Sequence, residues 1–246
     1  MEIQPALYMI PVAISDGAFD RYFPAYNSVV IQNISCFIVE NVRTARRFLK
    51  KLSPSLDIST IRFYELNGHT PEHEISTMLD PLREGEATGV MSEAGCPGIA
   101  DPGASVVRVA QAEGLKVVPL IGPSSILLAL MASGLNGQKF SFQGYLPVKD
   151  SEREKSIRDL EHESRRNDTT QIFIETPYRN QKMMQSLLRS LNAETLLCVA
   201  SDVSNPETES IVTKTVKEWK AEGKTLDKVP TIFLFYCPDS PRRRGK

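Results

Sequence analysis

The residues best suited to chemistry lie between positions 89 and 105, in the segment GVMSEAGCPGIADPGAS. Four glycines interrupt this segment: Gly89, Gly95, Gly98 and Gly103. Glycine lets a ligand approach the backbone closely, and a helix N-terminus offers free N–H groups to a carboxylate or phosphate. A plain connection from a strand to a helix needs two or three residues, whereas this one uses about nine. The segment therefore predicts a loop that binds a small polar ligand.

The residues after this loop predict a helix. Asp101 is placed to cap its first turn, Pro102 suits the first helical position, and Gly114 suits its end. No two glycines have the G-x-G spacing of dinucleotide loops, and the G-x-x-x-x-G-K-S/T loop of nucleotide triphosphate sites is absent. Cys96 could be a nucleophile or a small loop filler, and the absence of a nearby histidine in the sequence favours the filler.

A second loop of the same type follows in PLIGPSS, residues 119–125. Gly122 ends an apolar run, and Ser125 opens an apolar helix. Ligands of open α/β sheets bind outside the carboxyl ends of the strands. The two loops are therefore expected to face one crevice.

Apolar runs that alternate with helical patterns must position these loops. TARRFLKKL has one apolar helical face, and strands alternating with helices predict an α/β layer with a largely parallel sheet. The expected strands of the first half are 7–13, 28–32, 36–39, 61–66, 88–91 and 116–121.

The pattern changes after residue 121, which predicts two α/β domains, 1–121 and 122–246. The run from Ile126 to Ala132 is too apolar for a surface helix and is expected to be buried on most sides, with Gly134 at its end. The expected strands of the second sheet are 140–146, 170–175, 196–201, 209–215 and 230–236. A solvated, charge-balanced helix is predicted in KDSEREKSIRDLEHESRRND, and the stripe Met183, Met184, Leu187, Leu188 and Leu191 is expected to pack in the core.

Composition narrows the class of protein. Lys+Arg 29 against Asp+Glu 30 gives a formal net charge of -1, which predicts no strong polyanion partner by itself. The basic tail PRRRGK is expected to be a solvated terminus. Four scattered cysteines without a CxxC pair exclude a zinc ribbon and favour a reducing cytoplasm. No run reaches the roughly 18 apolar residues of a membrane span and no signal-peptide pattern is present, so a soluble cytoplasmic protein is predicted.

Four segments, in this order and spacing, resemble the tetrapyrrole methylase superfamily of S-adenosylmethionine-dependent methyltransferases: GVMSEAGCPGIADPG, VVPLIGPSSILLALMASGL, FSFQGYLP and FIETPYR. FIVENVRTARRFL and LYMIPVA extend the resemblance upstream. Within the superfamily, the chain is most similar to the branch that 2′-O-methylates a cytidine of small-subunit ribosomal RNA. The resemblance implies two α/β domains, S-adenosylmethionine in the cleft between them, and a homodimer.

The resemblance also implies site residues. Methyl transfer needs the acceptor held close and in line, and a general base helps when the acceptor is a ribose hydroxyl. Glu175 of FIETPYR is the candidate base, Arg179 is expected to steady it or a phosphate, and Glu40 and Arg43 match the branch's acidic-to-arginine segment. The residues expected to contact the cofactor are Pro11, Asp101, Ala104, Ser125, Ile126, Ile174, Ala200 and Pro230.

The sequence departs from the ribosomal branch at two places. VAISDGAFDRYF replaces a Gly-Asn-Leu-type loop, and Asn41 and Val42 replace an acid and a hydroxyl. Both places are where substrate is expected, so cofactor binding is better supported than any one acceptor. Three hypotheses follow: an RNA 2′-O-methyltransferase or a diverged paralogue, a small-molecule (tetrapyrrole-like) methyltransferase, and a non-catalytic module that binds S-adenosylmethionine.

The segment HTPEHE superficially suggests a metal site through His69 and His73. Pro71 places His69 before the start of a helix, with Thr70 as the expected cap, so the two imidazoles do not share a helical face. No metal is predicted.

Overall fold

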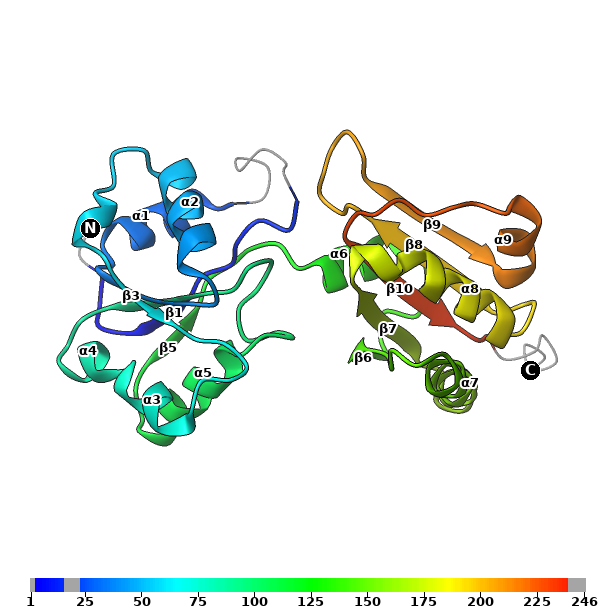
Figure 1. Cartoon of the computed structure of the whole chain (residues 1–246), viewed down its shortest axis with the longest axis horizontal. Helices are drawn as coiled ribbons and strands as arrows, with labels where there is room; N and C mark the ends of the chain where they lie inside the picture. The colour runs from blue at the N-terminus through cyan, green and yellow to red at the C-terminus, as the bar shows by residue number, and fades with distance from the viewer. Residues whose placement is uncertain (1–2, 16–22, 239–246) are drawn as a thin grey trace. The chain divides into compact units, whose positions relative to one another are not determined.

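The computed structural model describes residues 3–15 and 23–238, and the chain divides into two compact units, Met1–Ser124 and Ser125–Lys246 (Figure 1). The expected boundary at 121/122 falls in the segment that links them. Residues 16–22 and the basic tail 241–246 lie outside the described residues. No helix in the described ranges has both the length and the apolar character needed to cross a membrane.

The first unit is built on a five-stranded sheet in the order β3-β2-β4-β1-β5, and all of its strand pairs are parallel. The strands are β1 (Leu7–Met9), β2 (Cys36–Val39), β3 (Arg62–Glu65), β4 (Thr88–Met91) and β5 (Val117–Pro119). Strands β2 and β4 are buried along their whole length, which explains why β2 is apolar throughout and why Thr88 is the one polar residue of β4. The predicted parallel sheet is confirmed.

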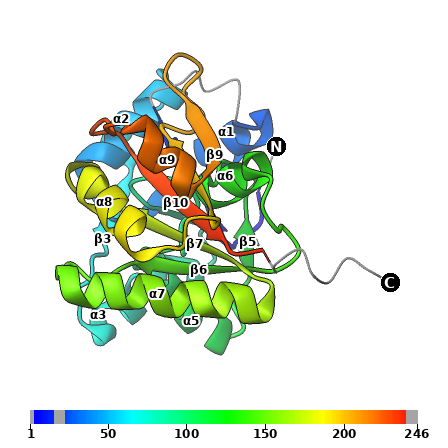
Figure 2. The same cartoon turned by 90° about the vertical axis from the view of Figure 1, so that its right-hand side faces the viewer.

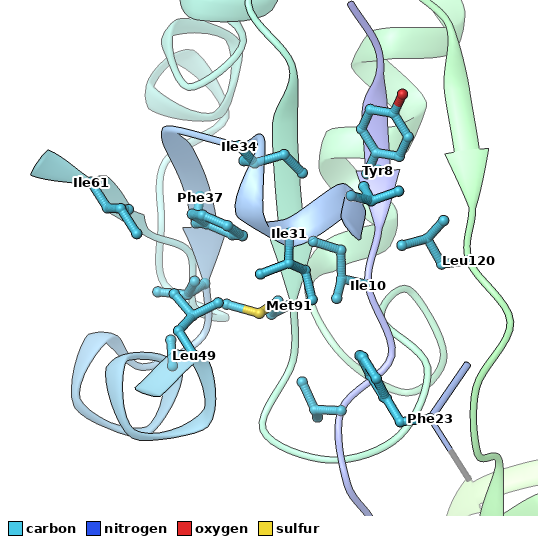
Figure 3. Close-up of a cluster of buried hydrophobic side chains, with 14 of the residues drawn as sticks. Tyr8, Ile10, Phe23, Ile31, Ile34, Phe37, Leu49, Ile61, Met91 and Leu120 are labelled. Carbon is cyan, nitrogen blue, oxygen red and sulfur yellow. The ribbon is translucent and has the colours of Figure 1, made fainter. Parts of the chain in front are cut away.

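Helices cover both faces of this sheet. One face carries a core that includes Ile31, Phe37 and Leu49 (Figure 3), and the other carries a core that includes Ile38 and Val106. The helical elements are α1 (Ala25–Gln32), α2 (Val42–Leu52), the 3-10 turn η2 (Ile58–Thr60), α3 (Glu72–Thr77), α4 (Asp80–Arg83) and α5 (Gly103–Ala112).

The expected strand at 28–32 was wrong, because these residues form the end of helix α1. Their β-branched side chains suggest a strand, but two strands of a parallel sheet must be joined by a crossover, and α1 lies between β1 and β2. The helix buries Val30 and Ile31, and the Nδ2 of Asn27 donates to the carbonyl of Ile121 at 2.8 Å. Tertiary packing therefore determines that this segment is a helix and not a strand.

Two helix starts also differ from expectation. Helix α5 begins at Gly103, so Pro102 is its N-cap residue and not its first helical residue. Helix α3 has Pro71 as N-cap without a side-chain cap, because the Thr70 hydroxyl accepts instead from the N–H of Asn67 at 3.0 Å. The expected end of α5 is confirmed, since Gly114 follows it with φ +69°.

The second unit carries a mixed sheet in the order β6-β7-β10-β8-β9, in which only β6 and β7 pair in parallel. The strands are β6 (Phe140–Tyr145), β7 (Thr170–Glu175), β8 (Leu196–Ser201), β9 (Ser210–Thr215) and β10 (Thr231–Tyr236). The other elements are α6 (Ser125–Ser133), α7 (Asp150–Asn167), the 3-10 turn η3 (Pro177–Arg179), α8 (Asn180–Ser190) and α9 (Val216–Glu222). The predicted strands of this unit and the charged helix at α7 are confirmed.

Two faces of this sheet have different partners. The face of Phe173 and Phe233 packs against α7, α8 and α9, which lie in front of the sheet in Figure 2. Helix α6 lies on the other face, where the Thr213 hydroxyl donates to the carbonyl of Ser133 at 2.7 Å. The methionine and leucine stripe of α8 is in the core, as expected.

Burial of α6 on most sides was wrong. Ala129 and Leu130 are buried, but Leu127 is 50% exposed and Met131 79% exposed. The helix contacts strands β9 and β10 through one side, and its apolar run continues around the other. Gly134 follows the helix with φ +70°, as expected.

Candidate active site

The carboxyl ends of β1, β2, β4 and β5 lie at one edge of the first sheet, because all these strands are parallel. Strand β4 is paired with both β1 and β2, so the loop after β4 emerges between the segments that follow β1 and β2. The N–H of Val12 donates to the carbonyl of Gly95 at 2.9 Å, which joins the segment after β1 to the glycine-rich loop. The two predicted loops therefore belong to one edge.

Asp101 organises the glycine-rich loop. Its Oδ1 accepts from the N–H of Gly98 at 2.9 Å and from the N–H of Gly103 at 2.7 Å. Asp101 thus binds the first N–H of α5, although it lies one residue before the N-cap position. A Cβ on Gly103 would lie 2.8 Å from that same Oδ1, so only glycine fits there. These contacts fix the conformation of the loop.

The second carboxylate oxygen of Asp101 has no partner. Oδ2 is buried, and no described atom donates a hydrogen bond to it. A buried acceptor without a partner costs free energy, so it marks a place where a ligand donor would fit. This atom fits a cofactor that presents hydroxyl or amino donors to the loop.

The loop after β5 lies against Pro11. A Cβ on Gly122 would lie 2.3 Å from the Cβ of Pro11 and 2.6 Å from its Cγ, so the backbone at Gly122 touches the proline ring. The thiol of Cys96 donates to the carbonyl of Pro123 at 3.4 Å, which fastens the two loops together. Burial, with Asp101 as a smaller cause, raises the pKa of the Cys96 thiol, so this residue fits the filler interpretation.

Glu40 directly follows β2 and lies beside this loop. Its Oε2 accepts from the N–H of Glu93 at 3.1 Å, and it lines one small pocket together with Ser92 and Asp101. Burial, and then the charges of Asp101 and Glu93, raise the pKa of Glu40, while the bond from the Glu93 N–H lowers it. A carboxylate with a raised pKa is a better proton acceptor than an exposed one.

The residues after Glu40 start helix α2. Asn41 is its N-cap, and its Oδ1 accepts from the N–H of Arg43 at 2.9 Å and of Thr44 at 3.2 Å. Thr44 in turn donates its hydroxyl to a carboxylate oxygen of Glu93 at 2.8 Å. Glu93 was missed by sequence reasoning, because only the fold brings it to Glu40 and Thr44.

In the second unit, three predicted cofactor residues lie together. Ile174 and Ala200 both pair with Ile232, from the two strands that flank β10, and Pro230 directly precedes β10. Ile174 and Ala200 belong to the face of the sheet that α6 covers, as the alternation from Phe173 and the contact of α6 show. Ser125 and Ile126 open α6 itself.

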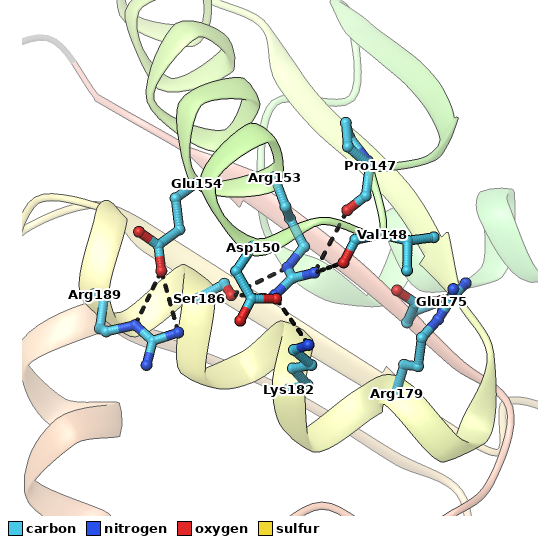
Figure 4. A network of polar contacts seen from close by, with 10 residues as sticks. All are labelled: Pro147, Val148, Asp150, Arg153, Glu154, Glu175, Arg179, Lys182, Ser186 and Arg189. Atoms are coloured by element: carbon cyan, nitrogen blue, oxygen red, sulfur yellow. Dashed lines mark hydrogen bonds and ion pairs between the residues drawn. The ribbon is translucent and has the colours of Figure 1, made fainter.

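Glu175 points to the opposite face from Ile174, because neighbouring residues of a strand alternate. Its side chain is only 2% exposed, and Oε1 forms an ion pair with Arg179 at 2.6 Å and accepts from the N–H of Thr176 at 2.7 Å (Figure 4). The pair spans the turn after β7. The resemblance left Arg179 either to steady Glu175 or to bind a phosphate, and the structure has an ion pair between the two side chains.

A buried arginine holds the neighbouring loop after β6. The guanidinium of Arg153 on α7 donates to the carbonyl of Val148 at 2.7 Å and to the hydroxyl of Ser186 at 3.0 Å (Figure 4). It also pairs with Asp150 at 2.8 Å, and Lys182 pairs with the same carboxylate. The balanced charges of this helix concealed Arg153, since only burial distinguishes it from its solvated neighbours.

The predicted absence of a metal at HTPEHE remains a prediction. Within residues 3–15 and 23–238, no group of three or more His, Cys, Asp or Glu side chains could hold a metal ion. His69 precedes helix α3, as expected.

Comparison with known proteins assigns the chain to a family. The model of the Tetrapyrrole (Corrin/Porphyrin) Methylases matches residues 30–220, which is most of the chain. The chain belongs to this family. Methyltransferases of this family use S-adenosylmethionine, and the buried acceptor on Asp101 fits a ligand with polar donors.

Among related sequences, the chain is similar to the ribosomal RNA small subunit methyltransferase I of Vibrio cholerae. The two are 32% identical over 235 residues, which cover 94% of this chain and 77% of the relative. The protein of the same name from Escherichia coli O157:H7 is 29% identical over 245 residues, covering 99% of this chain and 76% of that one.

Solved structures of tetrapyrrole methylases share the fold. The methyltransferase CobJ has a TM-score of 0.59 at 17% identity, with 94% of this chain and 93% of that chain covered. Uroporphyrin-III C-methyl transferase from Thermus thermophilus, complexed with S-adenosyl homocysteine, has a TM-score of 0.56 at 17% identity, with 94% and 97% covered. The resemblance stated from the four sequence motifs is confirmed.

Proposed function

We propose that this tetrapyrrole methylase transfers a methyl group from S-adenosylmethionine to a ribose 2′-hydroxyl of small-subunit ribosomal RNA. The observation that carries the proposal is the similarity along 94% of the chain to a ribosomal RNA small subunit methyltransferase. The loops at the edge of the first sheet supply a site of suitable chemistry.

In the first unit, the residues that would hold the cofactor are those of the two strand-end loops. Asp101 offers a buried acceptor, the backbone at Gly122 touches the ring of Pro11, and Ala104 is exposed in the first turn of α5. Ser125, Ile126, Ile174, Ala200 and Pro230 are proposed as the remaining contacts. The cofactor supplies an electrophilic methyl group, so the protein contributes position, orientation and a proton acceptor.

Glu40 is proposed as the general base. It receives a single backbone N–H bond, and its carboxylate neighbours oppose its ionisation, which strengthens it as a base. Glu175 is in a different situation, because its Oε1 is already occupied by the ion pair with Arg179 and by the bond from the N–H of Thr176. We therefore propose that Glu175 and Arg179 act on the reaction by fixing the turn after β7, and that exposed Arg43 neutralises a phosphate next to the acceptor.

Labelled S-adenosylmethionine tests the proposal. Small ribosomal subunits from a strain that lacks this protein should take up label, and nuclease digestion should release it as a 2′-O-methylated nucleotide. Glu40→Gln should lower the rate constant of transfer about 10²- to 10⁴-fold, as expected for loss of a general base. Glu65→Gln, at the exposed end of the neighbouring β3, is the matched control and should leave the rate unchanged.

The outcomes separate the alternatives. Label in RNA supports the proposal, and label only in small metabolites supports a tetrapyrrole-like acceptor instead. Cofactor binding without transfer to any acceptor indicates a non-catalytic module. No binding of S-adenosylmethionine by the unaltered protein would overturn all three.

Two features of assembly and location belong to the same proposal. We propose a homodimer, which the exposed apolar side chains of Leu127 and Met131 on α6 favour, and sedimentation of the purified protein would reveal its mass. A cytoplasmic location fits four free cysteines, three of them buried. Fractionation of cells tests this location.

A further inference from the structure

Helix α2 concentrates positive charge on a chain whose formal net charge is -1. Between Glu40 and Asp57 the sequence contains no acidic residue, and α2 has the sequence VRTARRFLKKL. Its basic residues are Arg43, Arg46, Arg47, Lys50 and Lys51, and all five are exposed. We call these five residues the α2 basic stripe.

Helix geometry places the stripe on one side. At about 100° per residue, the five positions fall within an arc of about 140°, and the apolar positions fall on the opposite arc. Ala45 and Leu49 are buried there against the core of the first sheet. The stripe is therefore a continuous solvent-facing surface, with successive charges about 1.5 or about 4.5 Å apart along the helix axis.

The stability of α2 does not explain the arginines of the stripe. Cations are unfavourable near a helix N-terminus, and Arg43 lies in the first turn, where no acidic residue is present. Like charges three and four residues apart repel, and the stripe contains several such pairs, among them Arg43 with Arg47. Lys50 and Lys51 do suit the C-terminal turn, so the first half of the helix needs another reason for its charge.

Local contacts leave these guanidinium groups open to a ligand. The guanidinium of Arg46 lies 5.3 Å from the ring centre of Phe63, a stacking contact that fixes its plane without neutralising it. Within the described residues, neither Arg43 nor Arg47 forms an ion pair. Lys50 differs, because its Nζ donates to the carbonyls of Pro54 and Leu56.

We propose that the α2 basic stripe binds the phosphate backbone of the RNA substrate, an inference that rests on the function proposed above. Phosphates need clustered cations, and the near-neutral composition of the chain gave no sign of such a cluster. The stripe begins three residues after Glu40, so a strand that follows it leads to the proposed base. Arg46 and Arg47 position the RNA and do not take part in the transfer step.

The test compares two double variants in the full-length protein. Arg46→Gln with Arg47→Gln removes two charges from the stripe and keeps good helix formers on exposed positions. The control is Arg108→Gln with Lys116→Gln, which also removes two exposed charges. Arg108 lies on α5, which packs on the other face of the same sheet, and Lys116 is the residue before β5. Thermal unfolding verifies that both variants fold.

Binding of a fluorescently labelled single-stranded RNA is measured from about 50 to about 200 mM salt, the range over which phosphate contacts are lost. Loss of two phosphate contacts should lower the slope of log K against log salt by about 1.4 and weaken binding about tenfold at 0.15 M. Affinity for S-adenosylmethionine should be unchanged, and the α5 control should match the unaltered protein.

Equal affinity and slope for the stripe variant and the unaltered protein would overturn the inference, as would a failure of the unaltered protein to bind this RNA. Methyl transfer distinguishes this result from failure of the proposed function. If RNA binding depends on the stripe but no label reaches RNA, the stripe is supported and the proposed reaction is wrong.

Discussion

Two substitutions of Asp101 separate its structural role from its role toward a ligand. Oδ1 accepts two backbone N–H bonds that shape the loop, whereas buried Oδ2 has no partner. Asp101→Asn retains one carbonyl oxygen, which can take the place of Oδ1, and puts an NH₂ group in the place of Oδ2. Asp101→Ala removes both oxygens and leaves the N–H groups of Gly98 and Gly103 without their acceptor.

The expected changes in stability and in cofactor affinity follow from these different roles of the two oxygens. A hydrogen bond to a charged group contributes about 1.5–3 kcal/mol, so loss of two of them in Asp101→Ala costs about 3–6 kcal/mol. At about 2–4 °C per kcal/mol for a chain of this size, the melting temperature should fall by at least about 6 °C. Asp101→Asn should lose about 2–3 kcal/mol of stability, because both bonds persist to a neutral acceptor that contributes about 0.5–1.5 kcal/mol for each. Its affinity for S-adenosylmethionine should nevertheless fall about 10- to 100-fold, because a donor now faces the ligand.

Calorimetry with S-adenosylmethionine and thermal unfolding of the three proteins measure these quantities. The expected pattern is weak binding by both variants, with a smaller loss of stability for Asp101→Asn than for Asp101→Ala. If Asp101→Asn binds the cofactor as tightly as the unaltered protein, the unpartnered Oδ2 is not a ligand contact and the reasoning is refuted.

Three further predictions use the same loops. Gly122→Ala should cost about 1–3 kcal/mol of stability and weaken cofactor binding, because its Cβ would lie 2.3 Å from the Cβ of Pro11. Gly68→Ala is the control, because a Cβ there meets nothing within 4 Å. It should change neither quantity in the same denaturation and binding assays. Burial raises the pKa of Glu40 above 4.5, so the folded protein holds this proton more tightly than the unfolded chain. The folded protein therefore loses stability as pH rises from 4.5 through the raised pKa. Glu40→Gln should therefore be more stable relative to the unaltered protein at about pH 7 than at about pH 4, and an equal difference in urea unfolding at both pH values would contradict this sign. Cys96→Ser should retain methyl transfer, since the raised pKa of this thiol opposes a nucleophilic thiolate; a loss of transfer with normal cofactor affinity would reinstate the nucleophile.

Much of the fold could be predicted from short apolar runs, because a buried parallel strand such as 36–39 is apolar throughout. The same rule failed at residues 28–32, where a β-branched run forms a crossover helix. Local pattern cannot distinguish the two, since the need for a crossover is a property of the whole sheet. The apolar run of α6 failed in another way, because composition predicts burial but not which sides of a helix receive partners.

The candidate site, too, could be predicted from the sequence only in part. Motifs identified Asp101 and Glu40, but not that one oxygen of Asp101 stays unpartnered or that Glu93 reaches Glu40 from another loop. Arg153 and the α2 basic stripe were concealed for a related reason. The net charge of a segment says nothing about which of its charges are buried, and the net charge of a chain says nothing about which ones share a helix face.

The replacement of an acid by Asn41 now has a physical explanation that bears on the acceptor. The side chain at this position is the N-cap of α2, and its oxygen is occupied by the N–H groups of Arg43 and Thr44. Asparagine and aspartate cap helices about equally well, so the change preserves the cap. A group held in this way is a poor candidate for a base or a metal ligand, so its loss of charge does not argue against catalysis. It also removes a negative charge next to Arg43, which favours the approach of a phosphate to the start of the α2 basic stripe.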